Sequence, residues 1–180
     1  MTEKGFIENI DAIRKRARKD IEEGAVTDAY KADRSAVVSL LNDALATELV
    51  CVLRYKRHYF MSKGLNAEPA AAEFLEHAKE EQAHADALAA RIVQLGGEPD
   101  FSPTKLASRS HAEYVAGESL SEMMREDLIA ERIAIDTYGQ IIRYIGDDDP
   151  TTRRLLEDIL ANEEEHADDL ASMLDVAETK

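Results

Sequence analysis

Cysteine is almost absent from this chain of 180 residues, and the single Cys51 excludes an intrachain disulfide. One thiol also excludes a structural zinc or iron–sulfur site built from several cysteines. Glycine and proline are scarce as well, with 8 and 4 residues that fall in a few short stretches. Because these residues interrupt regular structure, their scarcity leaves long uninterrupted segments between them.

Basic residues and long apolar runs are also few. The chain has 22 Lys and Arg against 37 Asp and Glu, which gives a net charge of −15. A charge of this sign opposes general adhesion to nucleic acid or anionic lipid, and it attracts cations. No apolar run approaches the roughly 20 residues that span a membrane, and the N-terminus lacks the apolar segment of a signal peptide. We therefore expect a soluble cytoplasmic protein with no membrane or DNA partner.

Four long segments carry apolar residues at three- and four-residue steps, which is the period of an amphipathic helix. The predicted helices span residues 35–63, 68–95, 119–145 and 150–176. Gly64 follows the first helix, and Pro69 and Pro150 stand in the first turns of the second and fourth. The capping-box sequence from Ser119 to Glu122 opens the third helix. The sequence thus predicts an all-α protein.

Residues 96–117 connect the second and third helices, and this segment is too long for a hairpin between antiparallel neighbours. It predicts a four-helix bundle with one long crossover, formed by residues 35–180. Residues 1–34 precede the bundle as a helix and a linker, with the amphipathic helix predicted at residues 4–23. We interpret its basic face, from Arg14 to Lys19, as a solvated surface because acidic residues flank it.

The sequence Glu-x-x-His occurs twice, as Glu81–His84 in the second helix and as Glu163–His166 in the fourth. On a helix this spacing places both side chains on one face, one turn apart. In the first and third helices, Glu48 and Glu131 each interrupt an apolar stripe, where a carboxylate without a partner is costly. All four positions fall at a similar depth in their helices, so antiparallel packing can bring them to one level.

Four carboxylates and two imidazoles suit iron or manganese better than zinc, which favours fewer and softer ligands. We expect two metal ions per chain, preferably iron, although ligand type alone separates iron from manganese poorly. The assignment is Glu48 and Glu131 as terminal ligands, Glu81 and Glu163 as bridges, and His84 and His166 as ligands of one metal each. Two adjacent ions of this kind can supply two electrons to one O2 or H2O2.

From about residue 36 to 175 the chain resembles bacterioferritin and its relatives in the ferritin-like superfamily. The matching stretches are Leu45–Leu49 with Tyr55, Glu81–Asp86, Leu128–Glu131 and Glu163–His166. The resemblance implies a ferritin-like four-helix bundle and a di-iron ferroxidase centre within the subunit, which oxidises Fe(II) with O2 or H2O2. It also implies storage of ferric mineral in a hollow homo-oligomer. Tyr55 matches the tyrosine that lies beside this centre in the family, and so joins the candidate catalytic residues.

The chain departs from bacterioferritin in several places. Gln82 stands where that family has the methionine that ligates haem, so haem is not expected. Few residues follow His166, and an extra helix precedes the bundle. Both features resemble the smaller, twelve-subunit Dps-like shells, and we favour a dodecamer over a 24-subunit shell. The paired cysteines near the site in some of those miniferritins are absent here.

Two other functions fit parts of the same sequence. A catalase or peroxidase with two manganese or iron ions would use the same six residues, with peroxide as its substrate. A structural or DNA-protecting shell would need the segment Arg14–Lys19 to be free and exposed. His77 lies two turns before His84 on nearly the same face, and we interpret it as a partly exposed surface histidine in preference to an accessory ligand.

Overall fold

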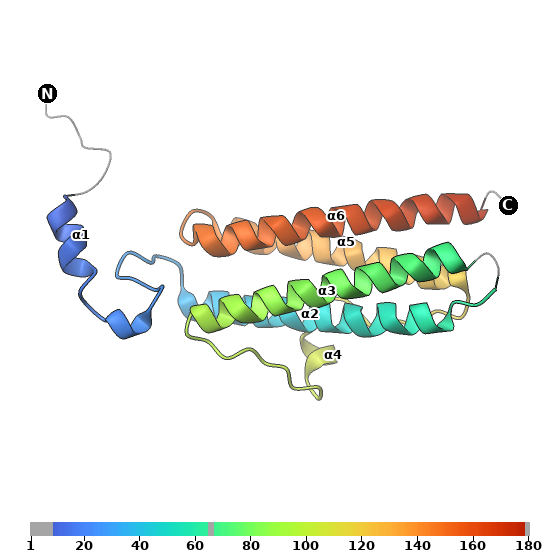
Figure 1. The fold of residues 1–180 in the computed structure, drawn as a ribbon, viewed down its shortest axis with the longest axis horizontal. Helices are drawn as coiled ribbons and strands as arrows, with labels where there is room; N and C mark the ends of the chain where they lie inside the picture. The colour runs from blue at the N-terminus through green and yellow to red at the C-terminus, as the bar shows by residue number, and fades with distance from the viewer. Residues whose placement is uncertain (1–8, 65–66, 179–180) are drawn as a thin grey trace, which may run out of the picture.

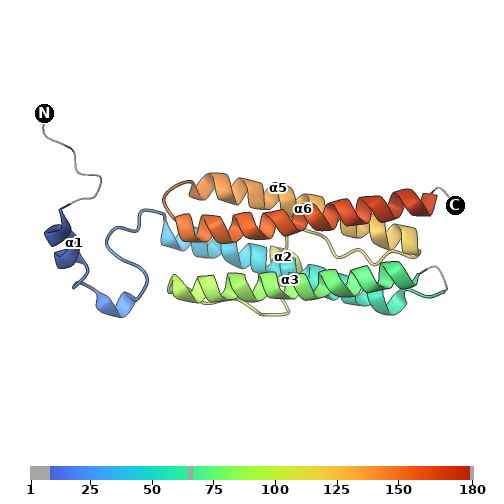
Figure 2. The ribbon, with the colours of Figure 1, turned by 45° about the horizontal axis from the view of Figure 1, so that its top comes forward.

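The computed structural model describes residues 9–64 and 67–178, and all regular secondary structure in these residues is helical. Four long helices form a bundle (Figure 1 and Figure 2): α2 (Arg34–Met61), α3 (Glu68–Gln94), α5 (Leu120–Ile145) and α6 (Pro150–Glu178). The shorter elements are α1 (Ile10–Arg16), the 3₁₀ helix η1 (Ile21–Glu23) and α4 (Leu106–Arg109).

The bundle consists of two antiparallel pairs, α2 with α3 and α5 with α6 (Figure 1). Few residues separate the two helices of each pair in the sequence. The segment between α3 and α5 instead runs back along the length of the bundle, and it contains α4, which packs on α2. The predicted fold, an all-α ferritin-like bundle with one long crossover, is confirmed.

Local sequence signals set the ends of the long helices, which fall within two residues of the predicted limits. Asp33 accepts hydrogen bonds from the amides of Ser35 and Ala36 and so caps α2. Ser119 and Glu122 form the predicted capping box at the start of α5. Gly146 ends α5 with a φ of 53°, a left-handed conformation that glycine adopts without steric cost.

The core of the bundle is divided into two apolar clusters. One gathers around Leu41, Leu88 and Leu156, and the other gathers around Phe74 and Leu170. In each long helix a glutamate separates the residues that join the first cluster from those that join the second. The packing therefore leaves a polar layer across the middle of the bundle, between two dry layers.

The segment before α2 differs from the single helix predicted at residues 4–23. Residues 1–8 lie outside the described part of the chain, and the helix that follows, α1, has seven residues, none of them buried. Asp20 has a φ of 44°, which interrupts the helix before η1. A helix this short is marginal unless packing supports it, and α1 projects away from the bundle (Figure 1). Its basic residues Arg14 and Lys15 are exposed.

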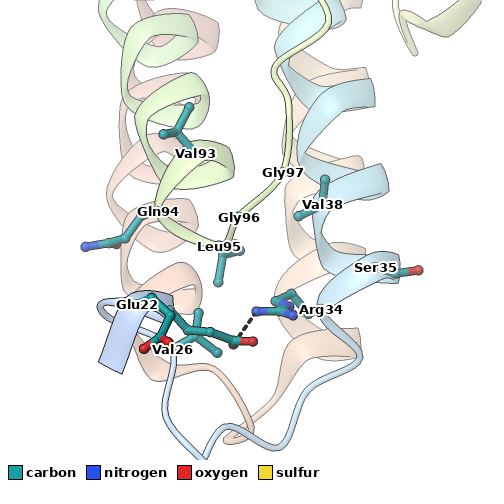
Figure 3. A pocket seen from close by; sticks show the side chains of 11 residues that line it. Glu22, Val26, Arg34, Ser35, Val38, Val93, Gln94, Leu95, Gly96 and Gly97 are labelled. Atoms are coloured by element: carbon teal, nitrogen blue, oxygen red, sulfur yellow. Dashed lines mark hydrogen bonds and ion pairs between the residues drawn. The ribbon is translucent and has the colours of Figure 1, made fainter. Parts of the chain in front are cut away.

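The linker after η1 is attached to the end of the bundle. Tyr30 donates a hydrogen bond of 2.8 Å to Asp149, and the same carboxylate accepts from Arg91. Arg34 pairs with Glu23 at 2.8 Å beside a surface pocket between the linker and the end of α3 (Figure 3). None of the predicted site residues lines this pocket.

Helix α2 is long and apolar enough to cross a membrane, with a mean hydropathy of 1.8 over 18 residues. This finding differs from the expectation that no segment would pass that test. However, 56% of the window is buried inside the bundle, and the helix also buries Glu48 and Arg54. The apolar character of α2 is therefore that of a core helix, which packs against α3, α4 and α5.

A buried ionic network fastens the crossover to the bundle. Asp127 of α5 accepts a hydrogen bond of 2.7 Å from Nε of Arg54, and its other oxygen lies 2.7 Å from Nδ1 of His58. Arg54 also donates to the carbonyl of Glu113, and Nε2 of His58 lies 3.0 Å from the carbonyl of Ala116. The network thus joins α2, α5 and the crossover through one carboxylate.

Replacing Asp127 with alanine should lower the free energy of unfolding by about 3–5 kcal/mol, because it leaves the Arg54 guanidinium buried without its counter-charge. Urea denaturation followed by circular dichroism measures the change. Asp136→Ala provides the control, since Asp136 is an exposed acidic residue on the same helix. Equal destabilisation by both substitutions would contradict the role given to the network.

Candidate metal centre

The polar layer of the bundle contains the six residues predicted as metal ligands. Each long helix contributes one glutamate, and α3 and α6 each add a histidine one turn later. All six side chains are buried, with exposed fractions between 0% and 7%: Glu48, Glu81, His84, Glu131, Glu163 and His166. The structure therefore brings together every residue of the predicted set.

The six side chains form two overlapping groups, in each of which the ligand-type atoms lie within 4.8 Å of one another. One group consists of Glu48, Glu81, His84 and Glu163, and the other consists of Glu81, Glu131, Glu163 and His166. Each group thus has one histidine and one glutamate of its own. Glu81 and Glu163 belong to both groups, which is the placement that bridging carboxylates require.

In both groups the histidine presents Nδ1 to the carboxylates. Nδ1 of His84 lies 3.5 Å from Glu48, 3.6 Å from Glu81 and 3.0 Å from Glu163. Nδ1 of His166 lies 3.7 Å from Glu81, 3.8 Å from Glu131 and 3.9 Å from Glu163. Each imidazole therefore directs one nitrogen toward a cluster of three carboxylate oxygens.

Most of the ligand-type atoms in the two groups have no hydrogen-bond partner among the described residues. They are Glu48 Oε2, both carboxylate oxygens of Glu81, His84 Nδ1, Glu131 Oε2, Glu163 Oε1 and His166 Nδ1. Buried polar atoms normally have a partner, because leaving one unpaired is costly. Convergent, unpartnered oxygen and imidazole nitrogen atoms are the donor set that divalent iron or manganese takes in proteins. The residues present fit two such ions.

Two tyrosines orient the carboxylates of Glu48 and Glu131, and each tyrosine lies on a different helix from the glutamate that it contacts. Tyr55 of α2 donates its hydroxyl proton to Oε1 of Glu131 on α5, and Tyr138 of α5 donates to Oε1 of Glu48 on α2. In both cases Oε2 is left for the centre. Tyr55 was expected beside the site, but Tyr138 was not. The signal was present in the sequence, since each tyrosine follows the glutamate of its own helix by seven residues.

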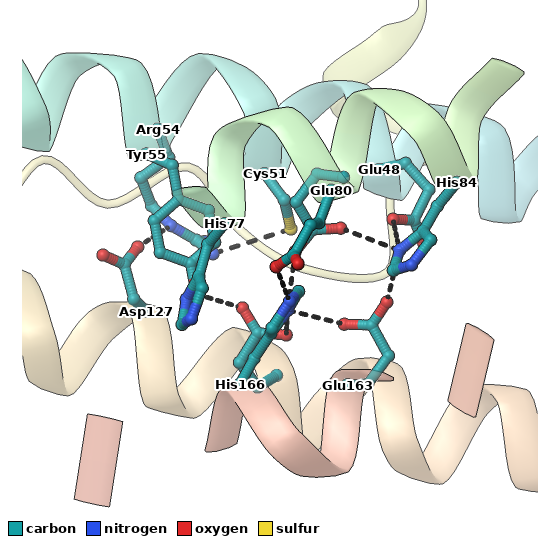
Figure 4. A network of polar contacts seen from close by, with 12 residues as sticks. Glu48, Cys51, Arg54, Tyr55, His77, Glu80, His84, Asp127, Glu163 and His166 are labelled. Carbon is teal, nitrogen blue, oxygen red and sulfur yellow. Dashed lines mark hydrogen bonds and ion pairs between the residues drawn. The ribbon is translucent and has the colours of Figure 1, made fainter. Parts of the chain in front are cut away.

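The surroundings of His166 contain two more residues whose role the sequence did not indicate (Figure 4). Glu80, which directly precedes the predicted ligand Glu81, lies 2.8 Å from Nε2 of His166. His77 is 1% exposed, so the preferred interpretation as a surface histidine is wrong. Its ring stacks on His166 at a centroid distance of 4.0 Å, and its Nδ1 lies 3.2 Å from the Tyr55 hydroxyl.

The crowding of carboxylates changes the proton affinities of the site. Burial lowers the pKa of both imidazoles, but the facing carboxylates outweigh it and raise the pKa of His84 and His166 to about 10. Burial and the neighbouring charge of Glu81 raise the pKa of Glu48 to about 8. Burial also raises the pKa of Glu131, but the facing His166 imidazole and Glu163 carboxyl outweigh burial, and the net pKa is lowered. In metal-free protein, protons therefore take the place of the missing positive charge.

The chain belongs to the ferritin-like family, because the family model described as the ferritin-like domain matches residues 38–179. A bacterioferritin of Brucella melitensis is 32% identical over 146 residues, which are 78% of this chain and 83% of that protein. The dodecameric thioferritin of Bacteroides fragilis, a bacterioferritin-related protein, is 32% identical with a TM-score of 0.78. That comparison covers 83% of this chain and 90% of the other.

A third similar protein bears on the haem question. The bacterioferritin of Rhodobacter capsulatus is 27% identical with a TM-score of 0.73, over 83% of this chain and 89% of that one. Its structure is described as having a metal-free dinuclear site and haem iron. The expected exclusion of haem therefore finds no support among the relatives. In this chain Gln82 donates a hydrogen bond of 3.0 Å to Asp86.

Metal-free protein should lose stability as the pH rises from about 6.5 to about 10. The pKa of His84 and of His166 is raised from 6.5 to about 10, so their stabilising charge is complete below pH 6.5 and is lost through pH 10. Glu48 acts in the same direction, because its raised pKa of about 8 makes ionisation above pH 4.5 unfavourable in the folded state. Thermal unfolding across this pH range measures the effect.

The Mn(II)-loaded protein is the control for this measurement, since bound metal replaces the protons and should flatten the decline. If the unfolding temperature of the metal-free protein stays constant or rises between pH 6.5 and 10, the stabilising role given to the protonated histidines is contradicted.

Proposed function

We propose that this protein oxidises Fe(II) at a di-iron ferroxidase centre within the subunit, with O2 or H2O2 as oxidant. The observation that carries the proposal is the pair of overlapping ligand groups, which share Glu81 and Glu163 and have unpartnered atoms aimed at their centres. Similarity to bacterioferritins supports iron over manganese. Two iron ions bound side by side supply two electrons to one oxidant molecule.

The residues of the chain divide the work of holding the ions. Glu81 and Glu163 would hold both ions, while Glu48 and Glu131 would each complete one of the two positions. Tyr138 and Tyr55 hold these outer carboxylates in place through hydrogen bonds to one oxygen each. Glu80 accepts the Nε2 proton of His166, which keeps Nδ1 of that ring free to bind metal. The dry apolar layers on both sides restrict the access of water to the centre.

The oxidised iron would be stored as a ferric mineral inside a hollow homo-oligomer in the cytoplasm. Similarity to the dodecameric protein of Bacteroides fragilis supports a shell of twelve subunits. The net charge of −15 supports the attraction of Fe(II) to such a shell. Size-exclusion chromatography with light scattering tests the assembly.

Glu163→Gln should slow the fast phase of Fe(II) oxidation by about 100-fold or more. Replacing a residue that only supports a metal ligand already lowers metal affinity or activity by about 10–100-fold. A larger effect is expected here because Glu163 is assigned to both metal positions. Glu164→Gln is the matched control, because Glu164 is the exposed neighbour on the same helix and the same charge is removed. Stopped-flow absorbance in the near ultraviolet measures the rate. Equal rates for the two variants would contradict the assignment of Glu163.

Storage is tested separately by the amount of iron oxidised. Fe(II) is added to metal-free protein under anaerobic conditions, and O2 or H2O2 is then mixed in. Oxidation that continues far beyond two iron ions per chain is expected for a protein that stores mineral. Oxidation that stops at two, with rapid consumption of added peroxide, would contradict storage and favour a peroxidase or catalase.

A further inference from the structure

A second group of metal-ligating side chains lies beside the di-metal centre, on its outer side. It consists of Glu73 and His77 of α3 and Asp169 of α6, and their ligand-type atoms lie within 4.8 Å of one another. None of the three belongs to the six residues of the centre. His77 is buried, whereas Glu73 and Asp169 are partly exposed. The group therefore reaches from the interior of the bundle to solvent.

The hydrogen bonds of Tyr55 determine which nitrogen of His77 faces this group. A tyrosine hydroxyl has one proton to donate, and Tyr55 donates it to Glu131. Its oxygen can therefore only accept from Nδ1 of His77, which lies 3.2 Å away. In a neutral imidazole the proton on Nδ1 leaves a lone pair on Nε2.

Nε2 of His77 faces negative charge rather than a donor. It lies 3.2 Å from Oε1 of Glu73, and Asp169 closes the group from α6. A nitrogen lone pair directed at a carboxylate is unfavourable unless a cation lies between them. One imidazole nitrogen with two carboxylates is a donor set that divalent transition metals accept.

We propose that Glu73, His77 and Asp169 bind a third divalent transition-metal ion, next to the metal position to which His166 is assigned. The stacked rings of His77 and His166, 4.0 Å apart, place the new site directly beside the centre. Its partly exposed carboxylates place it on a path from solvent. If the proposed function holds, this ion is Fe(II) that enters or leaves the ferroxidase centre.

The test counts Co(II) ions bound to the complete, metal-free protein. Co(II) is added at submillimolar concentration under anaerobic conditions, with excess Mg²⁺ to fill exposed carboxylate clusters, and bound metal is measured by equilibrium dialysis. Wild-type protein should bind three Co(II) per chain. Asp169→Asn and, independently, Glu73→Gln should bind two under the same conditions, because loss of one ligand weakens the third site by about 10-fold or more.

Asp168→Asn is the matched control, since Asp168 is the exposed neighbour of Asp169 and the same charge is removed. This variant should keep three Co(II). Two Co(II) in wild-type protein, or three in both Asp169→Asn and Glu73→Gln, would overturn the third site. The count does not depend on iron oxidation: two Co(II) with rapid Fe(II) oxidation rejects the third site alone, whereas three Co(II) without oxidation rejects the proposed function alone.

Discussion

Four carboxylates buried at one level of an apolar bundle are the constraint on which the rest of this structure depends. Ionised carboxylates lose most of their hydration there, and they repel one another. Two tyrosine hydroxyls satisfy one oxygen each of Glu48 and Glu131, but Glu81 has no hydrogen-bond partner on either oxygen. Cations bound at the proposed centre would resolve this conflict. The long helices, the crossover and the two apolar layers serve to hold the carboxylates where cations can join them.

The centre has an approximate twofold repeat, but its two halves differ in the residues that surround the histidines. Each half of the bundle supplies a glutamate, a tyrosine seven residues later and a Glu-x-x-His. Around His166, however, Glu80 and His77 add polar contacts that reach toward solvent. Among the described residues, the polar and ring contacts of His84 are all with residues of the centre itself. The His166 side is thus the more polar side of the site.

The fold and the grouping of the six residues could be predicted because both depend on local periodicity. The three-residue spacing of Glu163 and His166 fixes a shared helix face, and a single glutamate in an apolar stripe points inward wherever the helix packs. Two features depend on which helices become neighbours: the contact of Tyr138 with Glu48 and the burial of His77. Residue spacing within one helix does not predict which helices pack together. The shortness of α1 could not be predicted either, because its amphipathic pattern indicates a longer helix. In the described chain none of its residues is buried, so no packing stabilises a longer helix.

The most direct test of the central claim is anomalous diffraction at the iron edge from crystals soaked anaerobically with Fe(II). The account predicts two peaks per chain between Glu81 and Glu163, one in contact with Nδ1 of His84 and the other with Nδ1 of His166. A single peak, or iron bound only at surface carboxylates while these six side chains keep their positions, would contradict it.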